Sequence, residues 1–221
     1  MPTAITSRVL SLVAAIQAAL ARRQPAEDAV GREIARVRSG LKTWPPLTGG
    51  FPRNQHAATR HLPAALRAGN AATAGLLAAI NPVIHFLPWR YSYPPRADAP
   101  DLAQNIAFAE ILGPEAPLRT DALCLGLTLI GPETLYPAHR HPAVELYLVV
   151  AGTATWTLDG VVREHPPGAV ILHPSQAVHA MQTHADPLLA IYFWTGTDVY
   201  TTSVYTPPAG AAAAHHNHSP N

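Results

Sequence analysis

The chain has 221 residues, which is enough for one well-buried domain or for a domain with an extension. Lysine and arginine together number 15 and the acidic residues 14, so the formal net charge of +1 gives no electrostatic reason to expect a nucleic acid or an anionic membrane as a partner. The single cysteine, Cys124, excludes an internal disulfide, and its apolar neighbours predict a buried structural thiol.

The first apolar segment predicts an amphipathic helix that packs on a core, because its apolar residues recur at helical spacing. These residues are Ile5, Val9, Leu12, Ile16 and Leu20. A secretory signal peptide is the alternative, since an apolar run follows Arg8. We favour the helix, and with it a cytoplasmic protein. We count no stretch that approaches the roughly 20 apolar residues of a membrane-spanning helix.

Two further helices are expected in the N-terminal part. One covers residues 26–38, before Trp44-Pro-Pro and Gly49-Gly50 break the pattern. The other covers residues 62–80, where Asn81-Pro82 ends it.

An irregular connector is expected at residues 88–100, which are rich in proline and aromatic side chains. Its alternating aromatic residues Trp89, Tyr91 and Tyr93 could close a pocket as a lid. Residues 1–100 are therefore predicted to form a helical extension and a connector.

Residues 101–206 predict a mainly β domain. Short runs rich in β-branched and aromatic residues begin near residues 108–112 and continue to about Tyr205, and turn signals separate them. Asp159-Gly160 is one strong hairpin signal. The Ala-rich tail at residues 207–221, which contains three histidines, is expected to be disordered.

Alternate positions of one short stretch carry side chains that suit a metal: His139, His141, Glu145 and Tyr147. Residues two apart in an extended strand share a face, so these groups would project into one space. Imidazole and carboxylate together suit a divalent first-row metal. His179 supplies a plausible fourth ligand, because the strands and turns before it can return the chain to this site. Either histidine of the His-x-His pair alone would more often be structural.

The same residues resemble the two motifs of the cupin superfamily. The matching positions are Gly131, His139, His141, Glu145 and Gly152 in the first motif, and Gly168, Pro174 and His179 in the second. The gap after Gly131 is longer than usual, and Gln176 and Thr183 stand where glycine and asparagine are usual. The resemblance covers residues 131–183 and implies a cupin barrel, a double-stranded β-helix or jelly roll, behind the helical extension.

A narrower resemblance extends over most of the chain. Residues 135–147, with His179-Ala-Met and residues 188–194 downstream, are similar to the bacterial cupin-type dimethylsulfoniopropionate lyases. This resemblance implies a β-elimination that releases dimethyl sulfide and acrylate from a small zwitterionic substrate.

Such an elimination needs a base for the proton next to the carboxylate and a group that stabilises the resulting enediolate. A divalent metal would act as the Lewis acid and would lower the pKa of a nearby phenol. Tyr147 is the leading base, a role that the resemblance also gives to its counterpart, and Tyr136 is the second candidate, as base or substrate anchor. Trp194 and Tyr192 are candidates to face the sulfonium by cation–π attraction, with core packing as the competing explanation.

Several alternatives stay open at this stage. Another metal-dependent cupin enzyme, a dioxygenase or an isomerase, and a non-catalytic cupin that binds a small ligand fit the same fold. Zinc, iron, manganese and nickel all accept the ligand set, so the metal is not determined. A homodimer is open, since cupins often pair through their sheets. His173 is expected to point outward or to lie beside the ligands without binding the metal.

Overall fold

The computed structural model describes residues 4–23, 27–43, 51, 56–97 and 99–206. The helices are α1 (Ala4–Ala21), α2 (Ala29–Gly40), α3 (Leu62–Ala65), α4 (Ala74–Ile80) and α5 (Leu102–Asn105), with short 3-10 turns η1 (Ala57–His61) and η2 (Ile84–Phe86). The strands are β1 (Ile106–Gly113), β2 (Leu118–Arg119), β3 (Cys124–Ile130), β4 (Leu135–Arg140), β5 (Val144–Ala151), β6 (Ala154–Leu158), β7 (Val161–His165), β8 (Val170–His173), β9 (His179–Thr183), β10 (Leu188–Thr195) and β11 (Val204–Tyr205).

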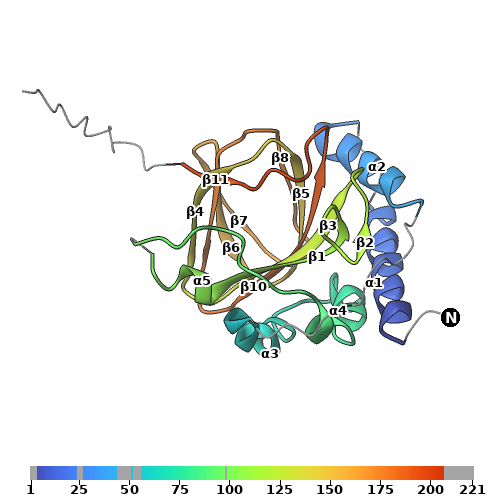
Figure 1. Ribbon diagram of the computed structural model, residues 1–221, viewed down its shortest axis with the longest axis horizontal. Coiled ribbons are helices and arrows are strands. Elements are labelled where there is room, and N and C mark those ends of the chain that lie inside the picture. The colour runs from blue at the N-terminus through green and yellow to red at the C-terminus, as the bar shows by residue number, and fades with distance from the viewer. Residues whose placement is uncertain (1–3, 24–26, 44–50, 52–55, 98, 207–221) are drawn as a thin grey trace, which may run out of the picture.

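The described strands form two sheets that face each other (Figure 1). The larger sheet has six strands in the order β2-β1-β3-β10-β5-β8, and the smaller has five in the order β11-β4-β9-β6-β7. Hydrogen bonding therefore gives a two-sheet sandwich and no single closed barrel among the described strands. The predicted mainly β architecture behind a helical N-terminal part is confirmed.

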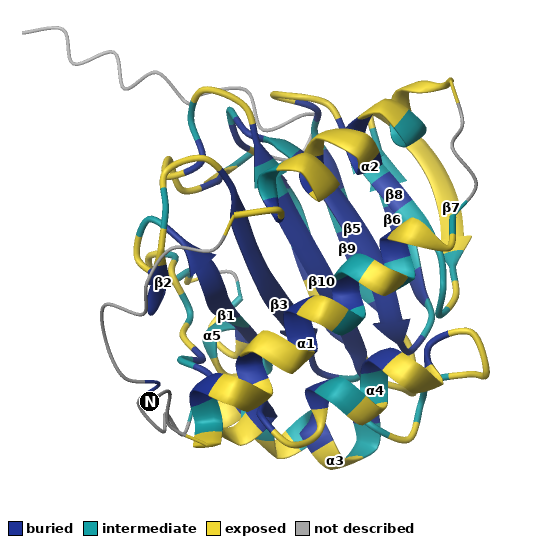
Figure 2. Ribbon diagram, turned by 90° about the vertical axis from the view of Figure 1, so that its right-hand side faces the viewer, coloured by how far each residue is buried: buried dark blue, intermediate teal, exposed yellow. Residues whose placement is uncertain are grey.

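Helices α1, α2 and α4 lie across the outer face of the six-stranded sheet (Figure 2). The apolar face predicted for the first helix is buried, with Leu12, Ile16 and Leu20 fully inaccessible. By length and composition α1 could cross a membrane, contrary to our count, but core helices and signal sequences pass the same test. In this structure α1 packs on α4 and α2, and its buried residues share a core with the sheet.

The second predicted helix is observed as α2, which begins later than expected. Asp28 caps it, because its side chain accepts a hydrogen bond from the backbone N–H of Gly31. The sequence breaks at Trp44-Pro-Pro and Gly49-Gly50 lie outside the described residues.

The third predicted helix is wrong as a continuous element, because the chain turns between α3 and α4. The Asn70 side chain accepts a hydrogen bond from the backbone N–H of Ala72 at 2.9 Å, and it donates to the carbonyl of Pro167 at 2.9 Å. An asparagine that bonds nearby backbone favours a turn over a helix. The described residues of the connector at 88–100 are irregular as expected, apart from a bridge between Arg90 and Phe108.

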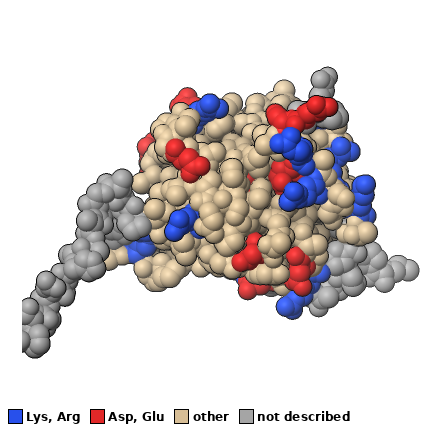
Figure 3. Space-filling view, turned by 90° about the horizontal axis from the view of Figure 1, so that it is seen from above, with Lys and Arg blue, Asp and Glu red and all other residues tan. Residues whose placement is uncertain are grey.

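The first strand, β1, begins at Ile106, close to the limit predicted for the β domain at residue 101. The predicted domain limits stay predictions, and the expected tail at residues 207–221 lies outside the described residues. On the described part of the face drawn in Figure 3, basic and acidic side chains lie interspersed among uncharged ones.

Candidate active site

The stretch from His139 to Tyr147 is not one strand, so the prediction of a shared strand face is wrong. Strand β4 ends at Arg140 and β5 begins at Val144, and Pro142 lies in the turn between them. Proline cannot donate to a strand ladder, which favours a break at this point. The turn carries the chain from the five-stranded sheet to the six-stranded sheet. The predicted residues nevertheless meet, because the inner faces of the two sheets look at each other.

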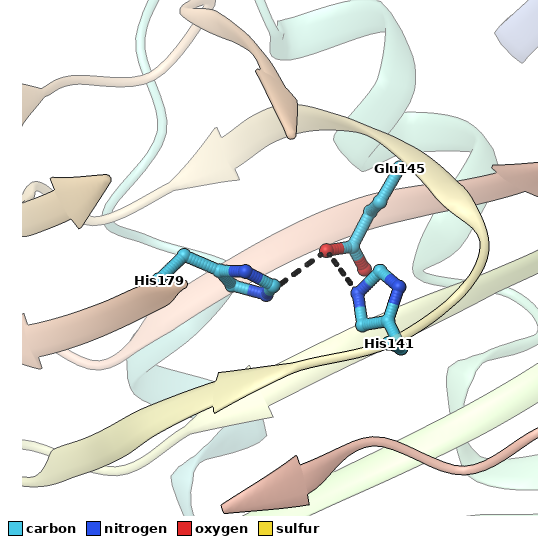
Figure 4. A group of neighbouring side chains, drawn as sticks. All are labelled: His141, Glu145 and His179. Carbon is cyan, nitrogen blue, oxygen red and sulfur yellow. Dashed lines mark hydrogen bonds and ion pairs between the residues drawn. The ribbon is translucent and has the colours of Figure 1, made fainter. Parts of the chain in front are cut away.

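Three of the four predicted ligands form a buried cluster between the sheets (Figure 4). The candidate ligand atoms of His141, Glu145 and His179 all lie within 4.8 Å of one another. The Oε2 atom of Glu145 is 3.1 Å from Nε2 of His141 and 3.4 Å from Nε2 of His179. A buried carboxylate between two imidazoles is a donor set that a divalent first-row metal accepts.

The backbone fixes the tautomer of each predicted histidine ligand. In each ring Nδ1 faces a backbone carbonyl two residues away, at 2.7 Å for His139, 3.0 Å for His141 and 2.9 Å for His179. A carbonyl only accepts, so Nδ1 carries a proton, and in the neutral ring Nε2 is then the nitrogen with a lone pair for a metal. The Nε2 atom of His179 is buried and makes no hydrogen bond within the described part of the chain. These residues therefore fit a metal ion.

His139 lies beside this cluster and outside it. Its ring centroid is 4.0 Å from that of His179, in an edge-on arrangement, and it stacks on Tyr136 at 4.0 Å. Strand pairing sets the first contact, because His139 on β4 lies directly opposite His179 on β9. The ligand role of His139 stays a prediction.

The charges of the cluster depend on one another. Burial alone would raise the pKa of Glu145, but His141 and the hydrogen bonds from the surrounding imidazoles hold it well below its usual range. For His141, burial opposes the charged ring, and the Glu145 carboxylate outweighs it and raises the pKa. Burial and the neighbouring His179 lower the pKa of His139 well below its usual value. Glu145 is therefore an ionised anchor among the histidines.

Of the two positions expected for His173, outward or beside the ligands, the structure shows the second, but sequence reasoning did not indicate that His173 and Trp194 hold Glu145. His173 on β8 is fully buried, and its Nδ1 lies 2.8 Å from Oε2 of Glu145. Its Nε2 accepts a hydrogen bond of 3.0 Å from the indole N–H of Trp156. On the other side, the indole N–H of Trp194 donates to Oε1 of Glu145 at 2.7 Å. The register of β5 with β8 would have indicated His173, since it lies directly opposite Glu145.

A cavity of about 370 Å³ opens onto the cluster. Its wall includes Tyr136, His139, Glu145, Tyr147, Tyr192 and Trp194. The cavity thus contains all four predicted catalytic and substrate-binding residues together with part of the predicted ligand set. Its size and its mixed aromatic and polar wall suit a small polar molecule.

The two candidate catalytic tyrosines lie deep in this cavity. The Tyr147 hydroxyl is 3.3 Å from Oγ1 of Thr128, and burial together with the Glu145 charge raises the pKa of this phenol well above its usual value. The Tyr136 hydroxyl is hydrogen-bonded to that of Tyr93, and burial also raises its pKa. A divalent cation in the cluster would oppose the rise for a phenol near Glu145.

The candidate sulfonium residues have other partners as well. Trp194 stacks on His141 with ring centroids 4.4 Å apart, in addition to its bond to Glu145. The Tyr192 hydroxyl lies 3.9 Å from the sulfur of Cys124, whose burial is as predicted. Both aromatic rings border the cavity, as a substrate role requires. The role itself stays a prediction.

Of the three aromatic residues predicted to close a pocket as a lid, one lines the cavity. Trp89 is fully buried and donates its indole N–H to the carbonyl of Ile84 at 2.8 Å, so it is a core residue. Tyr91 is hydrogen-bonded to Tyr205 at 3.0 Å and does not line the cavity. Tyr93 does line the cavity, next to Tyr136.

This chain is similar to known proteins in both sequence and fold. A family model described as dimethylsulfoniopropionate lyase matches residues 31–190. The chain is 35% identical over 156 residues to DddL of Cereibacter sphaeroides, a candidate dimethylsulfoniopropionate lyase, with 69% of this chain and 65% of that protein matched. It is 32% identical over 127 residues to the dimethylsulfoniopropionate lyase DddQ of Ruegeria pomeroyi, with 55% of this chain and 61% of that protein matched.

Each of these two matches spans less than two thirds of the relative, 65% and 61%. The structural match is longer. The crystal structure of DddQ from Ruegeria pomeroyi aligns with a TM-score of 0.70 and 28% identity over 92% of this chain and 98% of that one. The predicted cupin fold is confirmed.

Proposed function

The chain belongs to the dimethylsulfoniopropionate lyase family, and from this premise we propose that it is a carbon–sulfur lyase that converts dimethylsulfoniopropionate into dimethyl sulfide and acrylate. One observation carries the proposal beyond family membership. A single cavity brings the Tyr147 phenol together with Glu145 of the buried histidine cluster. A base next to a metal-binding group is what proton removal beside a carboxylate requires.

The metal part of the proposal uses His139, His141, Glu145 and His179 as ligands for one divalent ion, from among zinc, iron, manganese and nickel. The free Nε2 of His179 and the carbonyl-fixed tautomers support it. Such an ion would supply a Lewis acid for the substrate carboxylate and would favour ionisation of a neighbouring phenol.

The proton transfer is assigned to Tyr147. Its phenolate oxygen takes a proton from the carbon next to the substrate carboxylate, and the electron pair of that C–H bond forms the new C=C bond. The C–S bond breaks with its electron pair on sulfur, so neutral dimethyl sulfide leaves without being protonated. The Thr128 hydroxyl, 3.3 Å away, can donate to the phenolate before the transfer. Tyr136 anchors the substrate or serves as the second base.

The sulfonium end of the substrate is assigned to Trp194 and Tyr192. Both rings border the cavity that contains Tyr147, so a short substrate held at the metal would reach them. The face of an aromatic ring attracts a desolvated cation by about 0.5–2 kcal/mol. The burial of α1 on the sheet supports a core helix over a signal peptide. The cytoplasmic location is part of the proposal.

The direct test is gas chromatography of the headspace together with acrylate determination, using dimethylsulfoniopropionate and metal-loaded full-length protein. We expect equal amounts of the two products, and loss of both after the metal is chelated. Oxygen consumption in the same vessel separates a dioxygenase from a lyase. If the metal-loaded protein released no dimethyl sulfide, the proposed function would be wrong.

A further inference from the structure

We infer that His173 is a positioning residue of the metal centre: its Nδ1–H holds the Glu145 carboxylate in place, and Trp156 selects the tautomer that allows this bond. The inference rests on the proposed function only in taking Glu145 as a metal ligand. His173 itself is given no contact with substrate or metal.

The fold places His173 against two members of the cluster. It lies directly opposite Glu145 in the pairing of β8 with β5, with Nδ1 2.8 Å from the carboxylate oxygen Oε2. Its ring centroid is also 3.9 Å from that of His179. The side chain is fully buried, so water does not compete for either ring nitrogen.

The partner on the other side decides which nitrogen carries the proton. The indole N–H of Trp156 can only donate, so Nε2 of His173 must accept and its lone pair is used. The one proton of the neutral ring is then on Nδ1, where it can be donated only to Glu145. Both nitrogens are therefore committed, in contrast to His179, whose Nε2 has no hydrogen bond within the described residues. In the predicted ligands His141 and His179, Nε2 faces the Glu145 carboxylate, whereas in His173 a donor occupies the lone pair of Nε2. That difference separates a positioning histidine from a ligand.

Together, two donors fix both oxygens of the carboxylate. His173 holds Oε2, and Trp194 holds Oε1 at 2.7 Å. A carboxylate that is oriented before the metal arrives loses little freedom on binding. Removing such an outer partner typically weakens metal binding by about 10- to 100-fold.

The test is zinc binding by metal-stripped full-length protein in competition with a chromogenic chelator. His173→Leu removes the donor and is expected to weaken zinc binding at least about tenfold. His173→Asn returns an N–H near the position of Nδ1 and is expected to restore most of that affinity. Trp156→Phe leaves His173 free to take the other tautomer and is expected to fall between the two.

Two control variants separate positioning from general damage. His85→Asn removes an exposed imidazole and is expected to bind zinc like the wild type. Thr195→Val removes a buried hydrogen bond to Glu33 of α2, so it is expected to lower stability without changing zinc affinity. Far-UV circular dichroism and thermal unfolding of the metal-free proteins report which variants fold.

Three results would overturn the inference: a folded His173→Leu with wild-type zinc affinity, a folded His173→Asn as weak as His173→Leu, or equal weakening in Thr195→Val. If His173→Leu does not fold, Trp156→Phe decides, and wild-type affinity there overturns the inference. The titration contains no dimethylsulfoniopropionate. Zinc affinities in the expected order, from a protein that releases no dimethyl sulfide, would therefore support the inference and refute the proposed function.

Discussion

The two faces of the six-stranded sheet use the same strands for different purposes. On β5, Leu146, Leu148 and Val150 belong to the core shared with the helices, whereas Glu145 and Tyr147 face the other sheet. Both faces of β5 are buried, but on this strand only the inner face carries charge and hydroxyl groups. The outer face packs apolar side chains against the helices, whereas the inner face carries polar side chains in place of some apolar ones. The polar residues inside the apolar run of β5 therefore mark the face that carries the candidate site.

Substitutions on the inner face should lower zinc affinity, and the largest loss is expected for Glu145→Ala. This change removes the carboxylate that is hydrogen-bonded to His141 and His173 and that lies 3.4 Å from Nε2 of His179. Loss of a residue that only holds a ligand typically lowers metal affinity by about 10- to 100-fold. Loss of the ligand itself should therefore weaken zinc binding by more than about 100-fold and abolish dimethyl sulfide release. Chelator competition measures the affinity. Glu164→Ala, which removes an exposed carboxylate, is the control, and equal behaviour of the two variants would contradict the assignment.

The opposite result is expected on the outer face, for Phe193→Ala. Phe193 is fully buried in the core shared with the helices, so truncation leaves a cavity and should lower the free energy of unfolding by about 3–5 kcal/mol. Urea unfolding measures this loss. The protein that remains folded should bind zinc with wild-type affinity. A tenfold weaker affinity would show that the two faces are not separable.

A smaller effect sharpens the role of Trp194. Trp194→Phe keeps an aromatic ring and loses the N–H bond to Glu145. Zinc binding should weaken by about tenfold, the lower end of what a hydrogen bond to a charged group contributes. Trp194→Leu also loses the aromatic face. If that face holds the sulfonium, KM for dimethylsulfoniopropionate should rise by a further factor of about 2 to 30 between the two variants. Equal KM values would assign Trp194 to the carboxylate alone.

Much of the fold could be predicted from local patterns. The helical spacing of Leu12, Ile16 and Leu20 indicated a core-facing helix, and the turn at Asp159-Gly160 indicated a hairpin, which β6 and β7 form. The continuous third helix failed because Asn70 offers its side chain to the backbone, a local competition that apolar spacing does not show. Burial of Trp89 also depends on tertiary packing.

The site was predictable where its residues match a motif and less so where a contact depends on the pairing of strands. His141, Glu145 and His179 meet as expected, although by a sheet-to-sheet turn and not along one strand. The contacts that the sequence did not indicate lie in a row across neighbouring strands, in which Trp194, Glu145 and His173 are consecutive partners. A row across a sheet depends on strand order and register, and alternation within one strand does not contain that information.

The most direct test of the account is the rate of dimethyl sulfide release by Tyr147→Phe, with zinc affinity and unfolding measured on the same preparation. Removing the phenol hydroxyl should lower kcat by at least about 100-fold, the usual contribution of a general base, while the variant folds and binds metal like the wild type. Tyr91→Phe, which loses a hydroxyl bonded to Tyr205 away from the cavity, should keep its activity. Full activity in a folded, metal-bound Tyr147→Phe would contradict the account.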